Sequence, residues 1–282
     1  MTLYDQKYID LHTHTTLSDG SMTPEELVRH ALGKGLAAVA VTDHDTVSGV
    51  SRALEEGKKI GIEVIAGVEI SVDFSTEMHL LGYFPNGYSE SILKVLEDLR
   101  VRREQRNPRI VNKLNELGFD ITMEEISGTA GSDNVGRPHI ARVLQEKGYV
   151  DSMSEAFEKY LNVGRPAYFK KEKLLPKEGI AEIITAGGIP VLAHPIFIGL
   201  TYDRLDQLVG ELAGYGLKGI EVFYSWHTEE QTSELLKIAE KHGLLATGGS
   251  DFHGSFKSDI EIGIGTGTLK VPYSLLETLK QM

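Results

Sequence analysis

The chain contains no cysteine among its 282 residues. Disulfides, thiolate metal sites and a cysteine nucleophile are therefore excluded. The sequence also has no apolar run of the roughly 18 residues that a membrane-spanning helix needs. Its start, "MTLYDQKYIDL", lacks the basic and apolar segments of an export signal. We therefore expect a cytoplasmic protein without a membrane partner.

An excess of positive charge is absent as well. The chain carries 29 basic and 41 acidic residues, a net charge of −12. Broad affinity for nucleic acid depends on a basic surface, so we expect no stable binding of long nucleic acids. Residues 97–172 are neutral, with 13 basic and 13 acidic residues. The acidic remainder favours divalent cations, and the neutral segment would supply basic groups to a phosphate substrate. The sequence does not identify protein partners.

Short apolar runs alternate with helical patterns over most of the chain, which is typical of βα units with parallel strands. The apolar runs lie at 8–11, 36–42, 62–70, 78–84, 189–195, 217–224 and 244–251. Helices are expected at 23–34, 47–60, 177–187, 203–215 and 229–242. This alternation predicts an α/β fold, a βα barrel of about seven strands.

Residues 85–176 interrupt the alternation and have mainly helical patterns. A first helix is expected to run up to Pro108, and a second to continue through Leu117, where Gly118 stops it. Two more helices are expected in "RPHIARVLQEKG" and "MSEAFEKYLNVG". We interpret 97–172 as an inserted helical, substrate-binding subdomain, and 1–96 with 173–282 as one discontinuous barrel.

Histidines and carboxylates recur where the predicted strands end. Residues at the carboxyl ends of barrel strands converge on one face, where active sites lie. The candidate metal ligands that would meet there are His12, His14, Asp19, His44, Glu69, His79, His194, Asp251 and His253.

Imidazoles combined with carboxylates are the ligands that Zn, Mn and Fe prefer. So many donors favour two or three ions that share a bridging carboxylate, and such a cluster suits phosphoryl chemistry. A single histidine in a strand is more often a hydrogen-bonded structural residue, but joint placement at successive strand ends favours ligation. His30 and His242 are interpreted as structural, and His227 stays unassigned.

Six segments resemble, in order, the motifs of the polymerase and histidinol phosphatase (PHP) family. They are "DLHTHTTLSDG", "VAVTDHDT", "GVEIS", "MHLLGY", "LAHP" and "GSDFHG". The insertion, with "GRPHIARVL" and "AYF", is similar to stand-alone family members that act on nucleotides. Those include 3′,5′-nucleoside bisphosphate phosphatases and 5′-to-3′ exoribonucleases.

The resemblance implies a distorted seven-stranded (β/α)7, TIM-like PHP barrel with a trinuclear metal centre. Manganese is the usual ion of the family, and iron or zinc also occur. One metal would take His12, His14, Glu69 and Asp251. A second would take Glu69, His79 and His194. A third would take Asp19, His44 and His253.

The expected reaction is hydrolysis of a nucleotide phosphate monoester by attack of a metal-bound hydroxide, on the 3′-phosphate of a 3′,5′-nucleoside bisphosphate. The catalytic assignments are Asp19, His44, His194 and His253. The substrate-binding candidates are Arg103, Arg106, Arg137 and His139, since guanidinium groups match phosphate geometry. A solvated helix with ordinary Glu–Arg pairs is the alternative for Arg103 and Arg106.

Three other functions stay open at this point. The same metals would serve a 5′-to-3′ exoribonuclease that acts on short 5′-phosphorylated RNA. A histidinol-phosphate phosphatase is a further reading of the resemblance. A non-catalytic metal-binding module is the third, and the complete ligand set and the absence of any polymerase segment argue against it. The sequence does not identify the general acid or the natural substrate.

Overall fold

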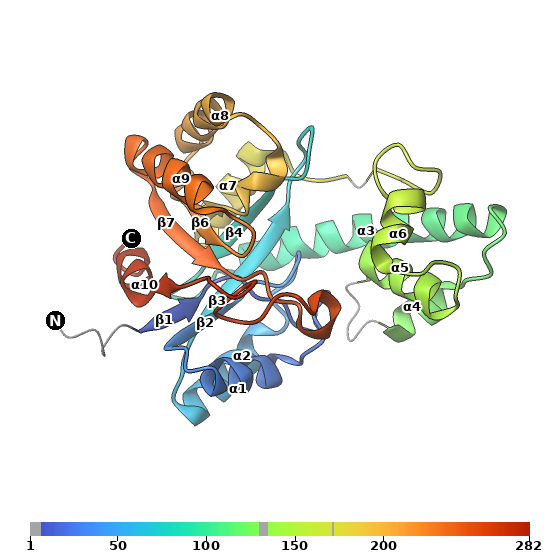
Figure 1. Cartoon of the computed structure of the whole chain (residues 1–282), viewed down its shortest axis with the longest axis horizontal. Helices are drawn as coiled ribbons and strands as arrows, with labels where there is room; N and C mark the ends of the chain where they lie inside the picture. The colour runs from blue at the N-terminus through green and yellow to red at the C-terminus, as the bar shows by residue number, and fades with distance from the viewer. Residues whose placement is uncertain (1–6, 130–134, 171) are drawn as a thin grey trace.

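The computed structural model describes residues 7–129, 135–170 and 172–282. The predicted α/β barrel with an inserted helical segment is confirmed (Figure 1). The described strands form one sheet in the order β7-β6-β5-β4-β3-β2-β1-β8. Their bounds are β1 Tyr8–Asp10, β2 Ala38–Val41, β3 Glu63–Ser71, β4 His79–Tyr83, β5 Ile189–Leu192, β6 Gly219–Tyr224, β7 Leu245–Gly249 and β8 Val271–Pro272.

Strand β4 departs from the expected parallel arrangement, because it runs antiparallel to both β3 and β5. Only residues 72–78 join β3 to β4, and a parallel pair needs a crossover of about a dozen residues or more. The reversal places His79, the first residue of β4, opposite Ser71 at the end of β3. An antiparallel strand thus brings its first residue to the barrel end at which the parallel strands finish.

The sheet contains eight strands instead of the expected seven. The additional strand, β8, is two residues long and pairs antiparallel with β1. Directly after β1, the Leu11 amide donates to Gly248 O of β7 at 3.1 Å. These contacts leave the barrel nearly closed, since β1 is linked to both ends of the strand order.

Helices cover the outside of the barrel (Figure 1). They are α1 Pro24–Gly33, α2 Val50–Ile60, α7 Pro176–Thr185, α8 Tyr202–Gly214, α9 Glu229–Lys241 and α10 Tyr273–Leu279. The first of them begins as its sequence predicts: Thr23 and Glu26 form a capping box and Pro24 occupies the first helical position. Buried Leu27, Val28 and Ala31 then face the sheet.

The insertion begins on one long helix, α3 Glu90–Glu116, which passes through Pro108 without ending. The expected break at Pro108 is therefore wrong. Both halves of the helix are anchored by packing: Leu96 and Leu99 lie in the barrel core, and Ile110 and Leu114 in the core of the insertion. Burial on both sides outweighs the roughly 3 kcal/mol that an internal proline costs.

The remaining helices of the insertion pack on the second half of α3. They are α4 Met123–Thr129, α5 Arg137–Glu146 and α6 Met153–Ala156, which continues as a π-helix, Phe157–Leu161. Their buried residues form one hydrophobic cluster drawn entirely from the stretch between Ile110 and Ala167. The buried residues of the other three clusters come from 9–99 and 180–279. This separation supports our proposed division into a 1–96 and 173–282 barrel and a 97–172 subdomain.

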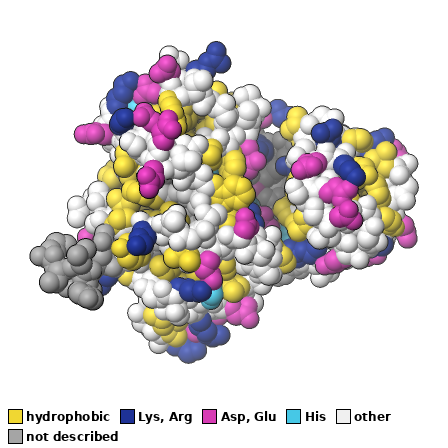
Figure 2. Space-filling view, in the orientation of Figure 1, with side chains coloured by type: hydrophobic (Ala, Val, Ile, Leu, Met, Phe, Trp, Pro, Cys, Tyr) yellow, Lys and Arg dark blue, Asp and Glu magenta, His cyan; other side chains and the backbone are white. Residues whose placement is uncertain are grey.

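Basic and acidic side chains alternate over the face of the molecule shown in Figure 2, without a broad basic area on that face. The insertion stands to one side of the barrel in this view. Among the residues that the structure describes, no helix is both long and apolar enough to cross a bilayer.

Candidate metal centre

The segment that follows β1 carries His12 and His14 into the interior of the barrel end. Backbone hydrogen bonds hold it on both sides: Asp251 N donates to His12 O at 2.9 Å, and Thr42 N donates to Thr13 O at 3.0 Å. The segment is extended, so His12 and His14 point to the same side and Thr13 to the other. The two imidazoles are completely or almost completely buried, and their ring centres lie 5.2 Å apart.

Glu69, near the end of β3, lies at the centre of the histidines. Its Oε2 is 3.3 Å from His12 Nε2, 3.2 Å from His14 Nε2 and 3.1 Å from His44 Nδ1. Its Oε1 is 2.8 Å from His79 Nδ1 and 2.9 Å from His194 Nε2. One carboxylate therefore faces five imidazoles that come from four different segments of the chain.

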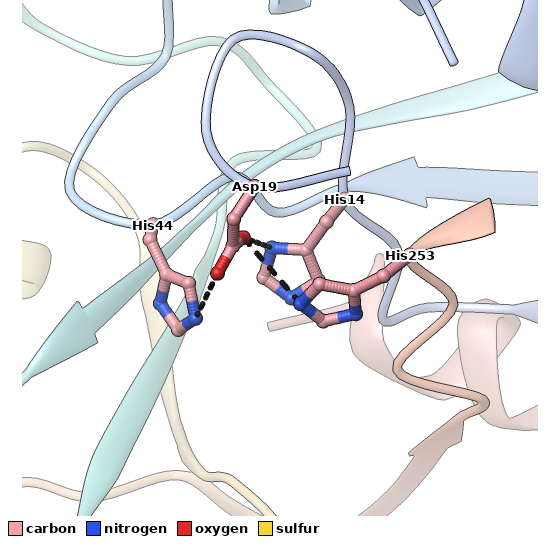
Figure 3. Close-up of side chains that lie close together, drawn as sticks. All are labelled: His14, Asp19, His44 and His253. Atoms are coloured by element: carbon pink, nitrogen blue, oxygen red, sulfur yellow. Dashed lines mark ion pairs between the residues drawn. The ribbon is translucent and has the colours of Figure 1, made fainter. Parts of the chain in front are cut away.

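Asp19 occupies a second position of this kind, between His44 on one side and His14 with His253 on the other (Figure 3). Its Oδ2 lies 3.8 Å from His44 Nε2. Its Oδ1 lies 3.6 Å from His14 Nδ1 and 3.4 Å from His253 Nε2. The loop that delivers Asp19 returns to Thr15, whose carbonyl accepts hydrogen bonds from Ser18 N and Gly20 N.

Asp251 completes the cluster from the end of β7. Its Oδ1 is 3.2 Å from His14 Nε2 and 3.6 Å from His12 Nε2. Its Oδ2 accepts from Lys257 Nζ at 2.7 Å and from the Tyr224 hydroxyl at 3.0 Å. The Asp251 backbone has a φ of 59°, a value that residues other than glycine rarely adopt.

The donor atoms are arranged as a cation would require. Three sets of ligand atoms each lie within 4.8 Å of one another: His14, Asp19, His44 and His253; His12, His14, Glu69 and Asp251; and His44, Glu69 and His79. In the part of the chain that the structure describes, His12 Nε2, His14 Nε2, Asp19 Oδ1 and Glu69 Oε2 are buried without a hydrogen-bond partner. Buried polar atoms normally have partners, so divalent metal ions fit this donor set.

The grouping differs in part from the one implied by the resemblance. The set of His12, His14, Glu69 and Asp251 appears as expected. His44, expected only beside Asp19 and His253, also approaches Glu69 and His79. His194 contacts Glu69, and its ring centre lies 5.1 Å from that of His79. All nine predicted ligands therefore lie in one cluster.

The charges in the cluster influence one another strongly. Burial raises the pKa of Glu69, but the surrounding imidazoles outweigh it and hold that pKa well below its usual range. Burial lowers the pKa of His14, yet Asp251 and Glu69 raise it to about 9. Burial dominates at His44 and lowers its pKa to about 3. Metal binding to His14 must displace its proton, whereas His44 is neutral and ready to ligate.

Three buried carboxylates behind the cluster were not identified from the sequence. Glu221 Oε1 lies 3.0 Å from His12 Nδ1, and its Oε2 accepts from the His194 amide at 2.8 Å. Asp43 accepts from the Thr15 amide and hydroxyl and from the Ser18 hydroxyl. Asp10 accepts from Ser250 and Gly263. Their only signal in the sequence was a position in or beside a predicted strand. Many buried residues without a functional role have such positions, so the signal was not specific.

Replacing Glu221 with glutamine is expected to weaken metal binding by roughly 10- to 100-fold, the usual effect of losing a carboxylate that orients a ligating imidazole. The amide keeps the size of the side chain but not the charge that polarises His12 Nδ1. Titration of the metal-free variant with Mn²⁺ measures the change. An unaltered dissociation constant would show that Glu221 only fills space.

Glycine at position 20 is required by close packing. A Cβ there would lie 2.3 Å from His14 O and 2.8 Å from Thr15 N, both of them backbone atoms that cannot move aside cheaply. We expect Gly20→Ala to displace the loop that carries Asp19 and to destabilise the fold by about 1–3 kcal/mol. Urea unfolding measures the stability. Gly33, with nothing within 4 Å of an added Cβ, provides the matched Gly33→Ala control.

Four basic side chains near the cluster were also not identified as functional. Lys257 contacts Asp251, and Lys173 donates to Val72 O at 3.4 Å beside the loop between β3 and β4. Arg142 stacks on Phe256, the third residue after His253. Lys170 pairs with Asp73 at 2.9 Å. Lys170, Lys173 and Arg142 lie far from the ligand motifs in sequence, whereas Lys257 follows His253 by four residues. Surface lysines and arginines are too common for their positions to have been recognised.

The predicted substrate-binding residues lie in the insertion. Arg137 Nη1 donates to Leu161 O at 2.9 Å, with the rings of Phe157 and Tyr168 near its guanidinium. Buried Arg106 donates to Asn107 Oδ1, and His139 Nδ1 accepts from Gly136 N at the start of α5. The side chain of Arg103 lies outside the described residues. Their binding roles stay predictions.

The fold is an α/β barrel, and its donor atoms gather where the strands end. These two features define the class as barrel proteins with a site suited to divalent metal ions. The PHP domain family model matches residues 10–175. The chain is 34% identical to a 5′-3′ exoribonuclease of Haemophilus influenzae, over 88% of this chain and 90% of that protein. It is 30% identical to a 3′,5′-nucleoside bisphosphate phosphatase of Chromobacterium violaceum, over 90% of each.

A solved Bifidobacterium adolescentis structure, proposed to be a metal-dependent phosphoesterase, is also similar. It is 32% identical, with a TM-score of 0.84 over 97% of this chain and 95% of that one. The chain belongs to the PHP family. It is a metal-dependent phosphoesterase, and the expected family resemblance and enzyme class are confirmed.

Proposed function

We propose that the enzyme removes the 3′-phosphate from a 3′,5′-nucleoside bisphosphate, using three divalent ions with manganese as the preferred one. The observation that carries this proposal is the partly open edge of the cluster. The side chains of Asp19, His44 and His79 are 13%, 22% and 12% exposed, whereas those of His12, His14 and Glu69 are at most 1% exposed. A phosphate would reach the donor set across this edge, where these ligand side chains are most exposed.

A basic group of the insertion, Arg137, and one that directly follows the insertion, Lys173, lie beside the same edge. Glu77 Oε1 is 4.0 Å from His79 Nε2 and interacts electrostatically with Arg137 and Lys173. Burial lowers the pKa of Arg137, with Tyr168 and Glu77 opposing the shift. Arg137 still remains charged at neutral pH. Two cations therefore stand where the second phosphate of a bisphosphate would extend from the metals.

Divalent ions in the cluster would polarise the phosphoryl oxygens and make a water molecule more acidic. The protein's own residues hold the geometry. Glu221 and Asp43 orient the segments that carry His12, His14 and His194. Glu69 and Asp19 supply the negative charge that divalent ions require. The catalytic role proposed for Asp19, His44, His194 and His253 is to hold these ions. The proposal needs no nucleophile from the protein.

Stepwise removal of nucleotides from the 5′ end of short RNA is the second candidate, favoured by the similarity to the Haemophilus influenzae exoribonuclease. The two functions differ in the length of the substrate. Manganese-loaded protein should release inorganic phosphate from adenosine 3′,5′-bisphosphate. If it degrades a 5′-phosphorylated oligoribonucleotide and leaves the bisphosphate intact, the first proposal fails and the second replaces it.

Arg137→Ala is expected to raise the KM for the bisphosphate by roughly 10- to 100-fold, since a charged hydrogen bond contributes about 1.5–3 kcal/mol. The kcat should change little, because the metals still hold the scissile phosphate. Steady-state kinetics on the bisphosphate and on p-nitrophenyl phosphate test this. An equal loss on the single-phosphate ester would mean that Arg137 is structural and acts through Leu161 O.

A further inference from the structure

Arg142 of α5 has an unusual environment for an arginine. Its Cζ lies 3.3 Å from the centre of the Phe256 ring, so the guanidinium is stacked on the aromatic face. Its Nη1 donates to Thr129 O at 3.3 Å. Its Nε and Nη2 are buried, and no described residue accepts a hydrogen bond from either atom.

Nε and Nη2 are the two nitrogens with which an arginine binds an anion through a pair of parallel hydrogen bonds. In an arginine side chain, Nε–H and one Nη2–H point the same way and form a fork for two oxygens of a phosphate or carboxylate. A buried donor without a partner costs about 1–3 kcal/mol, and more when it is charged. The stacking on Phe256 fixes the plane of this fork, which the described residues leave without an acceptor.

The guanidinium of Arg142 lies close to the metal centre. Phe256 lies on the short 3₁₀ helix Gly254–Lys257, which begins directly after His253. His253 Nε2 is 3.4 Å from Asp19 Oδ1, and Asp19 interacts electrostatically with Arg142. Burial lowers the pKa of Arg142, with Glu146 and Asp19 opposing that shift.

Arg137, on the same helix, interacts instead with Glu77, which stands beside His79. The helix α5 thus carries two arginines to two different edges of the cluster. One edge is formed by Asp19 and His253, and the other by His79.

We propose that Arg142, oriented by Phe256, binds a non-scissile phosphate of the substrate at the Asp19–His253 edge, separately from Arg137. This inference rests on the proposed phosphoesterase action on nucleotides and extends it. Two arginine subsites suit a short oligonucleotide with phosphates on both sides of the scissile one, and each subsite alone suits a bisphosphate.

The test compares wild type, Arg142→Gln and Phe256→Leu in the manganese-loaded full chain. Substrates are a 5′-phosphorylated triribonucleotide, adenosine 3′,5′-bisphosphate and p-nitrophenyl phosphate. We expect Arg142→Gln to raise the KM for one or both nucleotides by roughly 10- to 100-fold, with a smaller rise for Phe256→Leu. Values for p-nitrophenyl phosphate should stay within about two-fold, since that ester has no second phosphate to bind.

Arg109→Gln is the matched control, because Arg109 also belongs to the insertion and stacks on an aromatic ring, that of Phe169 at 4.6 Å. It should leave all three substrates unaffected. If Arg142→Gln changes neither nucleotide KM, or changes all three substrates equally, the inference is overturned. Phe256→Leu retains the arginine, so it tests the subsite even if Arg142→Gln folds poorly.

Equilibrium binding separates this inference from the proposed function. A phosphorothioate-linked 5′-phosphorylated trinucleotide is titrated into each manganese-loaded variant. If wild type hydrolyses neither nucleotide, yet binds the analogue roughly 10-fold or more tightly than Arg142→Gln, the proposed function fails and the subsite stands. If wild type hydrolyses a nucleotide and both proteins bind the analogue equally, the function stands and the subsite is overturned.

Discussion

Glu69→Gln should reduce phosphate release by roughly 1,000-fold or more, which corresponds to about 4 kcal/mol of transition-state stabilisation. Glu69 faces His12, His14, His44, His79 and His194, and it belongs to two of the three metal-fitting sets. Glutamine retains the shape of the side chain but removes the negative charge shared by these sets. Phosphate release and metal content by elemental analysis would both be measured.

Glu63→Gln is the matched control for this substitution. Glu63 begins the same strand, β3, but its carboxylate binds Tyr273 and Lys280 at the other end of the barrel. It should therefore keep full metal content and near-normal turnover. If Glu69→Gln kept wild-type metal content and turnover, the cluster could not be the catalytic metal centre.

Asp19→Ala is expected to give the second-largest loss, on the order of 100- to 1,000-fold in kcat. Asp19 is the carboxylate of the set that it forms with His14, His44 and His253 (Figure 3). Glu69 and Asp251 do not belong to that set. Without Asp19, we expect the ion of that set to be lost and the other sets to keep theirs, so metal content should fall by less than in Glu69→Gln.

The fold should survive the loss of Asp19, because its side chain is 13% exposed and the loop is held by backbone bonds to Thr15 O. His253→Ala removes another member of the same set and should lower kcat similarly. Asp203→Ala, on the exposed first turn of α8, is the control. Full activity in either Asp19→Ala or His253→Ala would remove that residue from the proposed site.

The sequence alone predicted the α/β barrel and brought the candidate ligands together at one end of it. Each βα unit follows from a local pattern, an apolar run and then a capped amphipathic helix, as at Thr23 and Pro24. In a parallel barrel, strand ends meet at one face whatever the exact packing. His12, Glu69 and Asp251 could therefore be grouped without coordinates, although 239 positions separate the first from the last.

Other features depended on contacts that no local pattern records. The direction of β4 was set by the short link at 72–78, and α3 continued past Pro108 because both of its halves are buried in different cores. The positions of Glu221 and Arg142 depend on contacts with residues distant in sequence. Glu221 contacts His12, and Arg142 stacks on Phe256. Local spacing in the sequence determines which side chains lie at the end of a strand. Only the packing of distant segments determines which residues support those side chains and which residues face them.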